Sequence, residues 1–308
     1  MRSGFICALM ALLAFAAAGC GSPPKRPAPA DPLLVQLATS GGSAYALNSF
    51  DRAARFYRLA LQRARALDDA TEIGKQAYNL AAALFMSGKP AEALPYLEEA
   101  ETAFAAIRED TGPILLLKAR ALRSAGGTNE ALSVLQRVVE LDTPRDVQAQ
   151  GWLLFGHIML DAGQGDEAEK ALRRARSVAS DDPVLRAGIA GLEARLAVLG
   201  GNPGLAAEKF DTEAAAFQEA GRYRDMADSL LRAGSAYAEA KLFERAGDRF
   251  YRAARSFYGQ GDTARALEAI ERALAAADRA PEAGWSKALA ALFNEIRANP
   301  AAEPSSTE

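Results

Sequence analysis

The sequence predicts an all-α fold in which about six to seven helix-turn-helix units stack into a superhelix. The first observation is composition: 50% of residues are hydrophobic but only 7% are aromatic, and alanine fills the difference, which favours helices. The second is a short phrase that recurs along most of the chain at a nearly constant step. The third is that glycine and proline fall mostly between the apolar segments, where helices begin and end. No segment has the pattern of a strand.

Residues 1–19 are predicted to be an export signal. Arg2 precedes an apolar run over residues 5–18, which is shorter than the roughly 20 residues needed to span a bilayer. The run ends in Ala17-Ala18-Gly19-Cys20, which resembles the lipobox of bacterial lipoproteins, with Ala17 where leucine is usual. The resemblance implies that Cys20 is lipidated and holds the chain on a membrane. The alternative is an ordinary signal peptide in which Cys20 is incidental.

Residues 20–32 are expected to form a tether. Five prolines lie in residues 21–32, and such a segment favours an extended polyproline II conformation of about 35–40 Å, at about 3.1 Å per residue. Gly21, rather than aspartate, follows Cys20, which favours an outer-membrane lipoprotein that faces the periplasm. An inner-membrane lipoprotein and a secreted periplasmic protein are the alternatives. The polar residues 299–308 are predicted to be a disordered tail.

Residues 33–298 carry the repeats. Each copy has turn residues, a small acidic or polar pair, an alanine and then an apolar residue, as in Gly88-Lys89-Pro90-Ala91-Glu92-Ala93-Leu94. The key alanines of six copies are Ala53, Ala93, Ala131, Ala168, Ala206 and Ala246. A small residue stands twelve positions before each of them: Gly41, Ala81, Ala119, Gly156, Ala194 and Gly234. Glycine or alanine at both positions allows two helices to pack closely.

This pattern resembles the tetratricopeptide repeat, and the resemblance implies a right-handed α-α superhelix over residues 33–298. The steps between key alanines are 40, 38, 37, 38 and 40 residues instead of 34, so the helices or the loops must be longer than usual. The last step, from Ala246 to Ala266, suits a single helix, so we expect a helix over 262–278 and a capping helix over 281–298. Gly188, Gly191, Gly200 and Gly201 in the fifth unit predict a locally weaker helix, with either a bend or close helix packing near residues 186–206.

Several kinds of chemistry are disfavoured by the composition. The chain has one histidine, His157, and two cysteines, and its net charge is −3. These counts argue against a histidine or cysteine metal cluster, a disulfide framework and general nucleic-acid binding. Adjacent carboxylate pairs such as Glu98-Glu99 do not converge on a helix, and no phosphate-binding or zinc-protease motif is present. We therefore expect no enzyme activity, cofactor, metal or small-molecule substrate.

The binding surface is expected on the concave side, which the first helix of every unit lines. Carrying over the groove positions of the family by register gives Tyr45, Lys75, Tyr78, Phe85, Leu116, Arg120, Arg123, Leu153, His157, Arg195 and Leu231. This stripe is aromatic toward its N-terminal half and has arginines near its middle. It suits a protein segment that carries an acidic or C-terminal carboxylate group.

The function that this predicts is a membrane-anchored scaffold or adaptor that binds protein partners in the periplasm. By architecture it resembles lipoproteins that help to assemble secretins, pili or outer-membrane proteins. One alternative is a scaffold for cell-wall glycan or peptidoglycan-remodelling enzymes. Another is a self-assembling structural lipoprotein.

Overall fold

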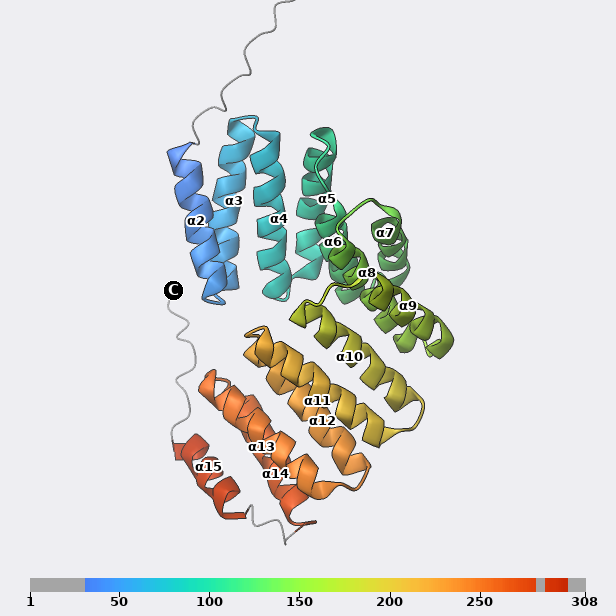
Figure 1. Cartoon of the computed structure of the whole chain (residues 1–308). Helices are drawn as coiled ribbons and strands as arrows, with labels where there is room; N and C mark the ends of the chain where they lie inside the picture. Colours follow the sequence, from blue (N-terminus) through green and yellow to red (C-terminus); the bar gives the residue numbers. More distant parts are fainter. Residues whose placement is uncertain (1–30, 281–285, 299–308) are drawn as a thin grey trace, which may run out of the picture.

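The computed structural model describes residues 31–280 and 286–298, which form fourteen helices and contain no strand (Figure 1). The predicted all-α superhelix is confirmed. The predicted signal (1–19), Cys20, all but the last two residues of the tether and the C-terminal tail lie outside the described residues. None of the helices in the described ranges is both long and apolar enough to cross a bilayer.

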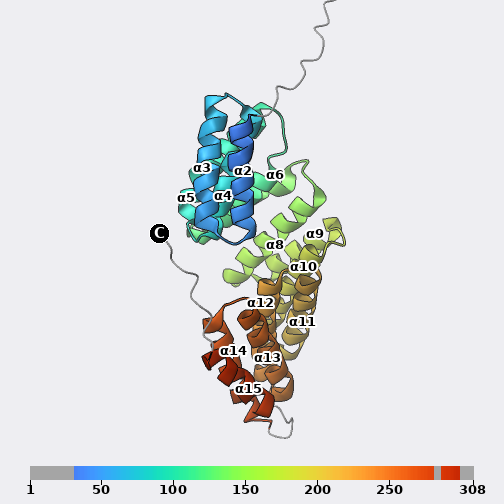
Figure 2. The same ribbon diagram turned by 90° about the vertical axis from the view of Figure 1, so that its left-hand side faces the viewer.

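The helices pair into seven units. Their bounds, unit by unit, are α2 (Pro32–Ala46) with α3 (Phe50–Ala66), α4 (Ala70–Met86) with α5 (Pro90–Ala106), α6 (Gly112–Ser124) with α7 (Thr128–Glu140), α8 (Arg145–Asp161) with α9 (Gly165–Val178), α10 (Pro183–Leu199) with α11 (Pro203–Glu219), α12 (Tyr223–Glu239) with α13 (Phe243–Gly259), and α14 (Thr263–Ala277) with α15 (Ser286–Ala298). The units follow each other along a curved path in which α6–α9 connect α2–α5 to α10–α15 (Figures 1 and 2).

Longer helices, rather than longer loops, account for the wide repeat spacing. Most helices have 17 residues and are joined by turns of three residues. In these turns one residue has a positive φ, as at Asn48 and Gly88. The next amide reaches back to the last turn of the helix: Ser49 N donates to the Ala44 carbonyl (2.9 Å). This closure satisfies carbonyls at the helix end and reverses the chain within three residues.

Two of the connections that depart from this turn leave their helix in an extended conformation, and the path of the superhelix turns where they occur (Figure 1). After α7 and α9 the chain leaves in an extended conformation, with ψ of 151° at Leu141 and 140° at Ala179. Helices α6, α7 and α9 are also shorter, with 13 or 14 residues. Asp182 then caps α10, because its carboxylate accepts from the Val184 and Leu185 amides.

The glycines of the fifth unit do not interrupt its first helix. Helix α10 is continuous over 17 residues, and its glycines lie against neighbouring side chains. A Cβ atom on Gly188 would lie 2.8 Å from Leu153 Cδ1, and one on Gly191 would lie 2.4 Å from Glu213 Oε1. The alternative of close helix packing therefore describes this segment, and no bend occurs within α10.

In the first and sixth units the core depends on a contact between the small residue of the first helix and the residue sixteen positions later on the second helix. Where the small residue is glycine, an aromatic ring can cover it: a Cβ on Gly234 would lie 2.7 Å from the Phe250 ring, and one on Gly41 would lie 2.7 Å from the Tyr57 ring. In the second and third units the small residue is alanine and the residue sixteen positions later is leucine, and all four of these residues are buried: Ala81 and Leu97, Ala119 and Leu135.

The last unit agrees with the prediction of a final helix and a capping helix. Leu289, Leu292 and Ile296 of α15 are buried in one cluster with residues of α13 and α14. Helix α15 thereby covers the apolar face that the previous unit would otherwise expose, as a terminal unit of a solenoid must.

The size matching in the core can be tested in the sixth unit. Gly234→Ala should lower the free energy of unfolding by about 1–2 kcal/mol, since overpacking costs about 1–3 kcal/mol and alanine in a helix recovers up to about 1. Phe250→Leu alone should also destabilise the protein, because it leaves a void. The double variant recreates the alanine–leucine pair of other units. Its decrease in the free energy of unfolding should therefore be at least about 1 kcal/mol smaller than the sum of the decreases in the two single variants.

Urea denaturation followed by circular dichroism measures all three. Gly259→Ala is the matched control, because a Cβ there has no atom within 4 Å, and it should not lower stability. Additive losses in the double variant would show that Gly234 and Phe250 do not constrain each other.

Candidate functional site

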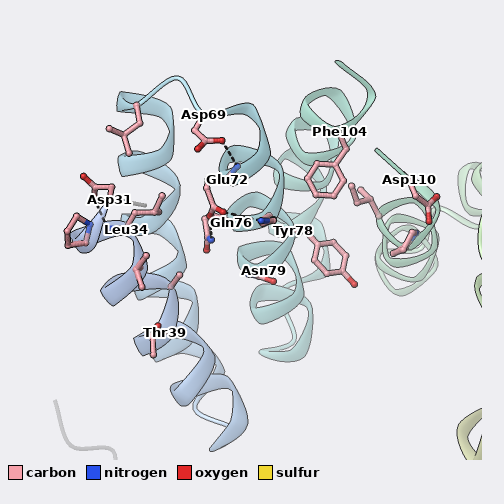
Figure 3. Close-up of a pocket in the computed structure, with 17 residues that line it drawn as sticks. Asp31, Leu34, Thr39, Asp69, Glu72, Gln76, Tyr78, Asn79, Phe104 and Asp110 are labelled. Carbon is pink, nitrogen blue, oxygen red and sulfur yellow. Dashed lines mark hydrogen bonds and ion pairs between the residues drawn. The ribbon is translucent and has the colours of Figure 1, made fainter. Parts of the chain in front are cut away.

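Three hollows follow each other on the face that the first helices line. The N-terminal pocket, of about 1020 Å³, lies between α2, α4 and the start of α6 (Figure 3). A central groove of about 640 Å³ lies over α6, α8, α10 and α12, and a smaller hollow of about 370 Å³ lies between α12 and α14. The concave face therefore offers a continuous series of sites along the superhelix.

The walls of the N-terminal pocket are apolar and its edge is acidic. Its lining residues are Asp31, Pro32, Leu34, Val35, Ala38, Thr39, Leu67, Asp69, Glu72, Lys75, Gln76, Tyr78, Asn79, Phe104, Asp110, Pro113 and Ile114. Figure 3 shows Tyr78 and Phe104 between α4 and α6, while Leu34 and Thr39 come from α2. Asp31 is tied to Arg63 (2.6 Å), and this hydrogen bond lowers the pKa of Asp31 to about 2.

Arg123, Arg195 and Arg232 line the central groove, and together with Arg120 and Arg222, which do not line it, they form what we call the arginine band. They come from the third, fifth and sixth units. Arg123 and Arg195 share the carboxylate of Asp161, at 2.7 and 2.6 Å. The curvature of the superhelix brings Arg222, just before α12, close enough to Arg120 on α6 for charge repulsion to lower the pKa of Arg120.

The members of the band differ in how fully they are neutralised. Arg222 pairs with Asp225 (2.8 Å), and Arg232 pairs with Glu213 (2.9 Å) while it lies over the Phe210 ring at 4.8 Å. Arg120 donates only to the amide oxygen of Gln150 (2.9 Å) and forms no ion pair within the described part of the chain. Desolvation is the main cause that lowers its pKa. A ligand carboxylate would therefore gain most from Arg120.

His157 lies inside this cationic surrounding and is held neutral. Arg195 Nη1 donates to His157 Nδ1 (3.0 Å), and because arginine can only donate, the histidine proton resides on Nε2. Burial and the charge of nearby arginines lower the pKa of His157 from 6.5 to about 4. A base this weak contributes a hydrogen-bonding group to the groove at neutral pH rather than a proton acceptor.

One member of the arginine band, Arg232, pairs with a buried carboxylate, that of Glu213. Glu213 on α11 is 5% exposed, and burial raises its pKa, while the charge of Arg232 acts in the opposite direction. Its side chain lies against Gly191 of α10. Glu213 therefore fixes Arg232 at the border of the fifth and sixth units.

The predicted groove residues divide into three groups. Lys75 and Tyr78 line the N-terminal pocket, Arg123, His157 and Arg195 line the central groove, and Leu231 lines the hollow between α12 and α14. Tyr45 and Phe85 are half-buried and pack against the core of the first units. Leu116 (5% exposed) and Leu153 (6%) are a correction: they fill the contact between successive first helices and present no surface to a ligand.

Other residues of the site were not predicted. Arg222 precedes its helix, and Phe104 and Phe210 belong to second helices, so a register of first-helix positions does not include them. Gln76 is next to the predicted Lys75. It could have been predicted, because it is a polar residue at a position where the helix presents its apolar face. Glu213 gave no signal, because its burial depends on contacts with another unit.

Comparison with known proteins agrees with the repeat fold. Residues 251–296 match the sequence profile of the tetratricopeptide repeat, and no curated protein matches the chain in sequence. One similar solved structure is the Cut9–Hcn1 hetero-tetramer of the APC/C, with a TM-score of 0.53, 15% identity, and coverage of 88% of this chain and 49% of that chain. This chain thus spans about half the length of that structure.

Two further solved structures have the same fold. The apo form of RapI has a TM-score of 0.51 and 14% identity, covering 81% of this chain and 99% of that chain. A signal-transduction ATPase with a tetratricopeptide repeat sensor from Pyrococcus horikoshii has a TM-score of 0.52 and 15% identity, covering 85% of this chain and 44% of that chain. The predicted tetratricopeptide repeat solenoid is therefore confirmed as the fold of this chain.

The surroundings of His157 predict a pH dependence of stability. Because its pKa is lowered from 6.5 to about 4 on folding, the unfolded chain binds the proton more readily, and the free energy of unfolding should fall by about 2–3 kcal/mol as the pH drops from about 7 to 4. Arg123, Arg195, Arg232 and Asp161 are the charged groups that face it.

Urea titrations of the wild type and His157→Gln at several pH values measure this contribution. Glutamine can still accept from Arg195 but cannot titrate. The stability difference between the two proteins should be constant above pH 7 and shift in favour of the variant below pH 6.5. An unchanged difference across this range would contradict the buried, neutral state of His157.

Proposed function

We propose that this chain, which has the tetratricopeptide repeat fold, is an adaptor that binds a protein partner in its concave face through an acidic segment of that partner. The arginine band carries the proposal. Three guanidinium groups, those of Arg123, Arg195 and Arg232, line the central groove. Among the described residues the five arginines of the band form ion pairs with three carboxylates, those of Asp161, Glu213 and Asp225, although the whole chain has a net charge of −3. A locally basic groove in an acidic protein favours an anionic ligand.

The chemistry of arginine fits such a ligand. A guanidinium group presents planar donors that match a carboxylate, and arginine is enriched among the residues that dominate binding energy. Arg120 has a neutral partner and is exposed, so a partner carboxylate could reach it and complete its ion pairing without displacing another one. Stacked first helices present this row to an extended or helical segment.

A scaffold role fits the site better than catalysis. The one histidine is a weak base, and its Nδ1 is already engaged by Arg195. Tyr78 and Phe85, which a glycan-binding groove would expose, are half-buried, and both pack against the core. These observations favour a protein segment as ligand over cell-wall glycan. A self-assembling structural protein remains the second alternative, and light scattering of the purified chain tests it.

The location that we propose rests on the sequence. Cys20 in its lipobox-like context would carry acyl chains, and the proline-rich residues up to Pro32 would hold the solenoid away from an outer membrane on its periplasmic side. Fixing the adaptor to a membrane raises the local concentration of the groove, so a modest affinity suffices to retain a partner. Assembly of an envelope complex is the process that such a tethered adaptor suits.

The arginine band is tested with a fluorescent twelve-residue peptide of alternating aspartate, glutamate and serine. The double variant Arg120→Gln and Arg222→Gln should weaken its binding at least about tenfold, because it removes two charges that converge on the groove. Fluorescence anisotropy at about 50 mM salt measures the dissociation constant, and circular dichroism checks the fold.

Arg173→Gln with Arg174→Gln is the matched control, since it removes the same charge from the exposed face of α9. It should change the dissociation constant by less than about twofold. Equal losses of affinity in both double variants would show that only the net charge of the protein matters. Absence of binding by the wild type would reject an acidic segment as ligand.

Membrane anchoring is tested separately with Cys20→Ala. Without the thiol no acyl chain can be attached, so the protein should move from the membrane fraction to the soluble periplasmic fraction, as followed by immunoblotting after osmotic shock. Cys7→Ala, within the predicted signal, should leave the distribution unchanged. Membrane retention of the Cys20 variant would overturn the lipoprotein assignment.

A further inference from the structure

We propose that the N-terminal pocket is a second docking site, which binds an apolar stretch of the partner that carries a lysine or arginine. The inference rests on the proposed function, because it takes the ligand to be a protein segment in the concave face. It adds a site of opposite charge to the arginine band and names the chemistry that this site selects.

The size and the walls of the pocket fit several apolar side chains. At about 1020 Å³ it lies at the upper end of the range of about 300–1,000 Å³ for small-ligand sites. Leu34 and Ile114 form buried parts of the wall, and Val35 on α2 is 49% exposed at the mouth. Removing this apolar surface from water on docking is favourable.

The charges around the pocket favour a cation. Four carboxylates line it, those of Asp31, Asp69, Glu72 and Asp110, and Lys75 is the cation among the lining residues. Arg63 neutralises Asp31 from α3, and Lys75 lies 3.2 Å from Glu72. Asp69 and Asp110 face no cation within ion-pair distance in the described residues: Asp69 accepts from the Glu72 amide, and Asp110 accepts from the Gly112 amide and the Thr143 hydroxyl.

A buried acceptor without a partner points to a hydrogen-bond donor in the ligand. Gln76 is 4% exposed and lines the pocket; its Nε2 donates to Glu72 Oε2 (2.9 Å), but its Oε1 has no hydrogen-bond partner (Figure 3). Leaving a buried acceptor unpaired is unfavourable, and a donor from a bound segment would recover this loss. A lysine or arginine, or a backbone amide beside it, supplies such a donor.

The pocket adjoins the arginine band, so one partner can occupy both. Tyr78 lines the pocket and also lies close enough to Arg120 for the two to affect each other's pKa. A partner segment with a basic, apolar stretch followed by an acidic stretch would therefore place each charge against its complement. This continuity with the proposed groove favours a segment of a protein over a free small molecule.

The test uses three synthetic helical peptides of sixteen residues and the full-length protein. The first has a leucine face flanked by lysines, the second has glutamate in place of every lysine, and the third has serine in place of every leucine. Isothermal titration calorimetry measures binding to the wild type, to Val35→Lys and Glu72→Gln in the pocket, and to Leu59→Lys. Leu59 is the matched control, because it is 48% exposed on α3 and lines none of the hollows described above.

The lysine peptide should bind the wild type at least about tenfold more tightly than either of the other two peptides do. Val35→Lys should weaken its binding at least about tenfold and Glu72→Gln about threefold, whereas Leu59→Lys should change it less than about twofold. Equal binding of the lysine and glutamate peptides, or an unchanged affinity in Val35→Lys, would overturn the proposal. A dimer detected by sedimentation that Val35→Lys dissociates into monomers would also overturn the proposal, because the occupant of the pocket would then be a second copy of the chain.

The two proposals fail in distinguishable ways. Val35→Lys should leave the binding of the acidic twelve-residue peptide to the arginine band unchanged. If the wild type binds the lysine peptide but not the acidic peptide, the proposal for the arginine band alone is rejected. If it binds the acidic peptide but not the lysine peptide, the proposal for the pocket alone is rejected.

Discussion

The structure depends on one steric constraint, the close approach of two helices at a residue without a large side chain. In the first and sixth units the ring of Tyr57 or Phe250 occupies the space that a Cβ on Gly41 or Gly234 would take. Once this contact fixes the distance between two helices, a three-residue turn is long enough to connect them, and the remaining apolar face can be covered only by the next unit. The concave face is a consequence, because every first helix must then lie on the same side.

Charged side chains add a second level of order, from one unit to the next. Ion pairs join residues about one repeat apart, as between Arg65 and Glu99 (2.6 Å) or Arg249 and Asp211 (2.7 Å). Exposed pairs of this kind contribute about 0–1 kcal/mol each to stability. They therefore favour one alignment of neighbouring units more than they stabilise the fold. Arg120 departs from this pattern, because it has an amide instead of a carboxylate partner. The stacking register therefore leaves a cation uncompensated, which is a reason to assign it to binding.

The sequence was sufficient to predict the fold because the same pattern is repeated. Six alanines and six small residues at matching positions are compatible with few arrangements other than stacked helix pairs. It was sufficient to place Lys75, His157 and Arg195 at the hollows, since position on a first helix decides which side a residue faces. It failed for Leu116 and Leu153, because α6, α8 and α10 touch where the path turns, and this turn depends on the extended connections after α7 and α9. Arg222 reaches Arg120 only through the curvature of several units, and no single repeat encodes that curvature.

The order of charges along the groove has a consequence for recognition that neither site has alone. An acidic, apolar pocket over the first three units adjoins a basic band at Tyr78 and Arg120. A partner segment that entered in the reverse direction would bring its cation to the arginines and its carboxylates to Asp69 and Asp110, and such like-charge contacts cost several kcal/mol. The groove therefore selects direction as well as composition. In a chain tethered at its N-terminus, a fixed direction would also determine which end of the partner lies nearest the membrane.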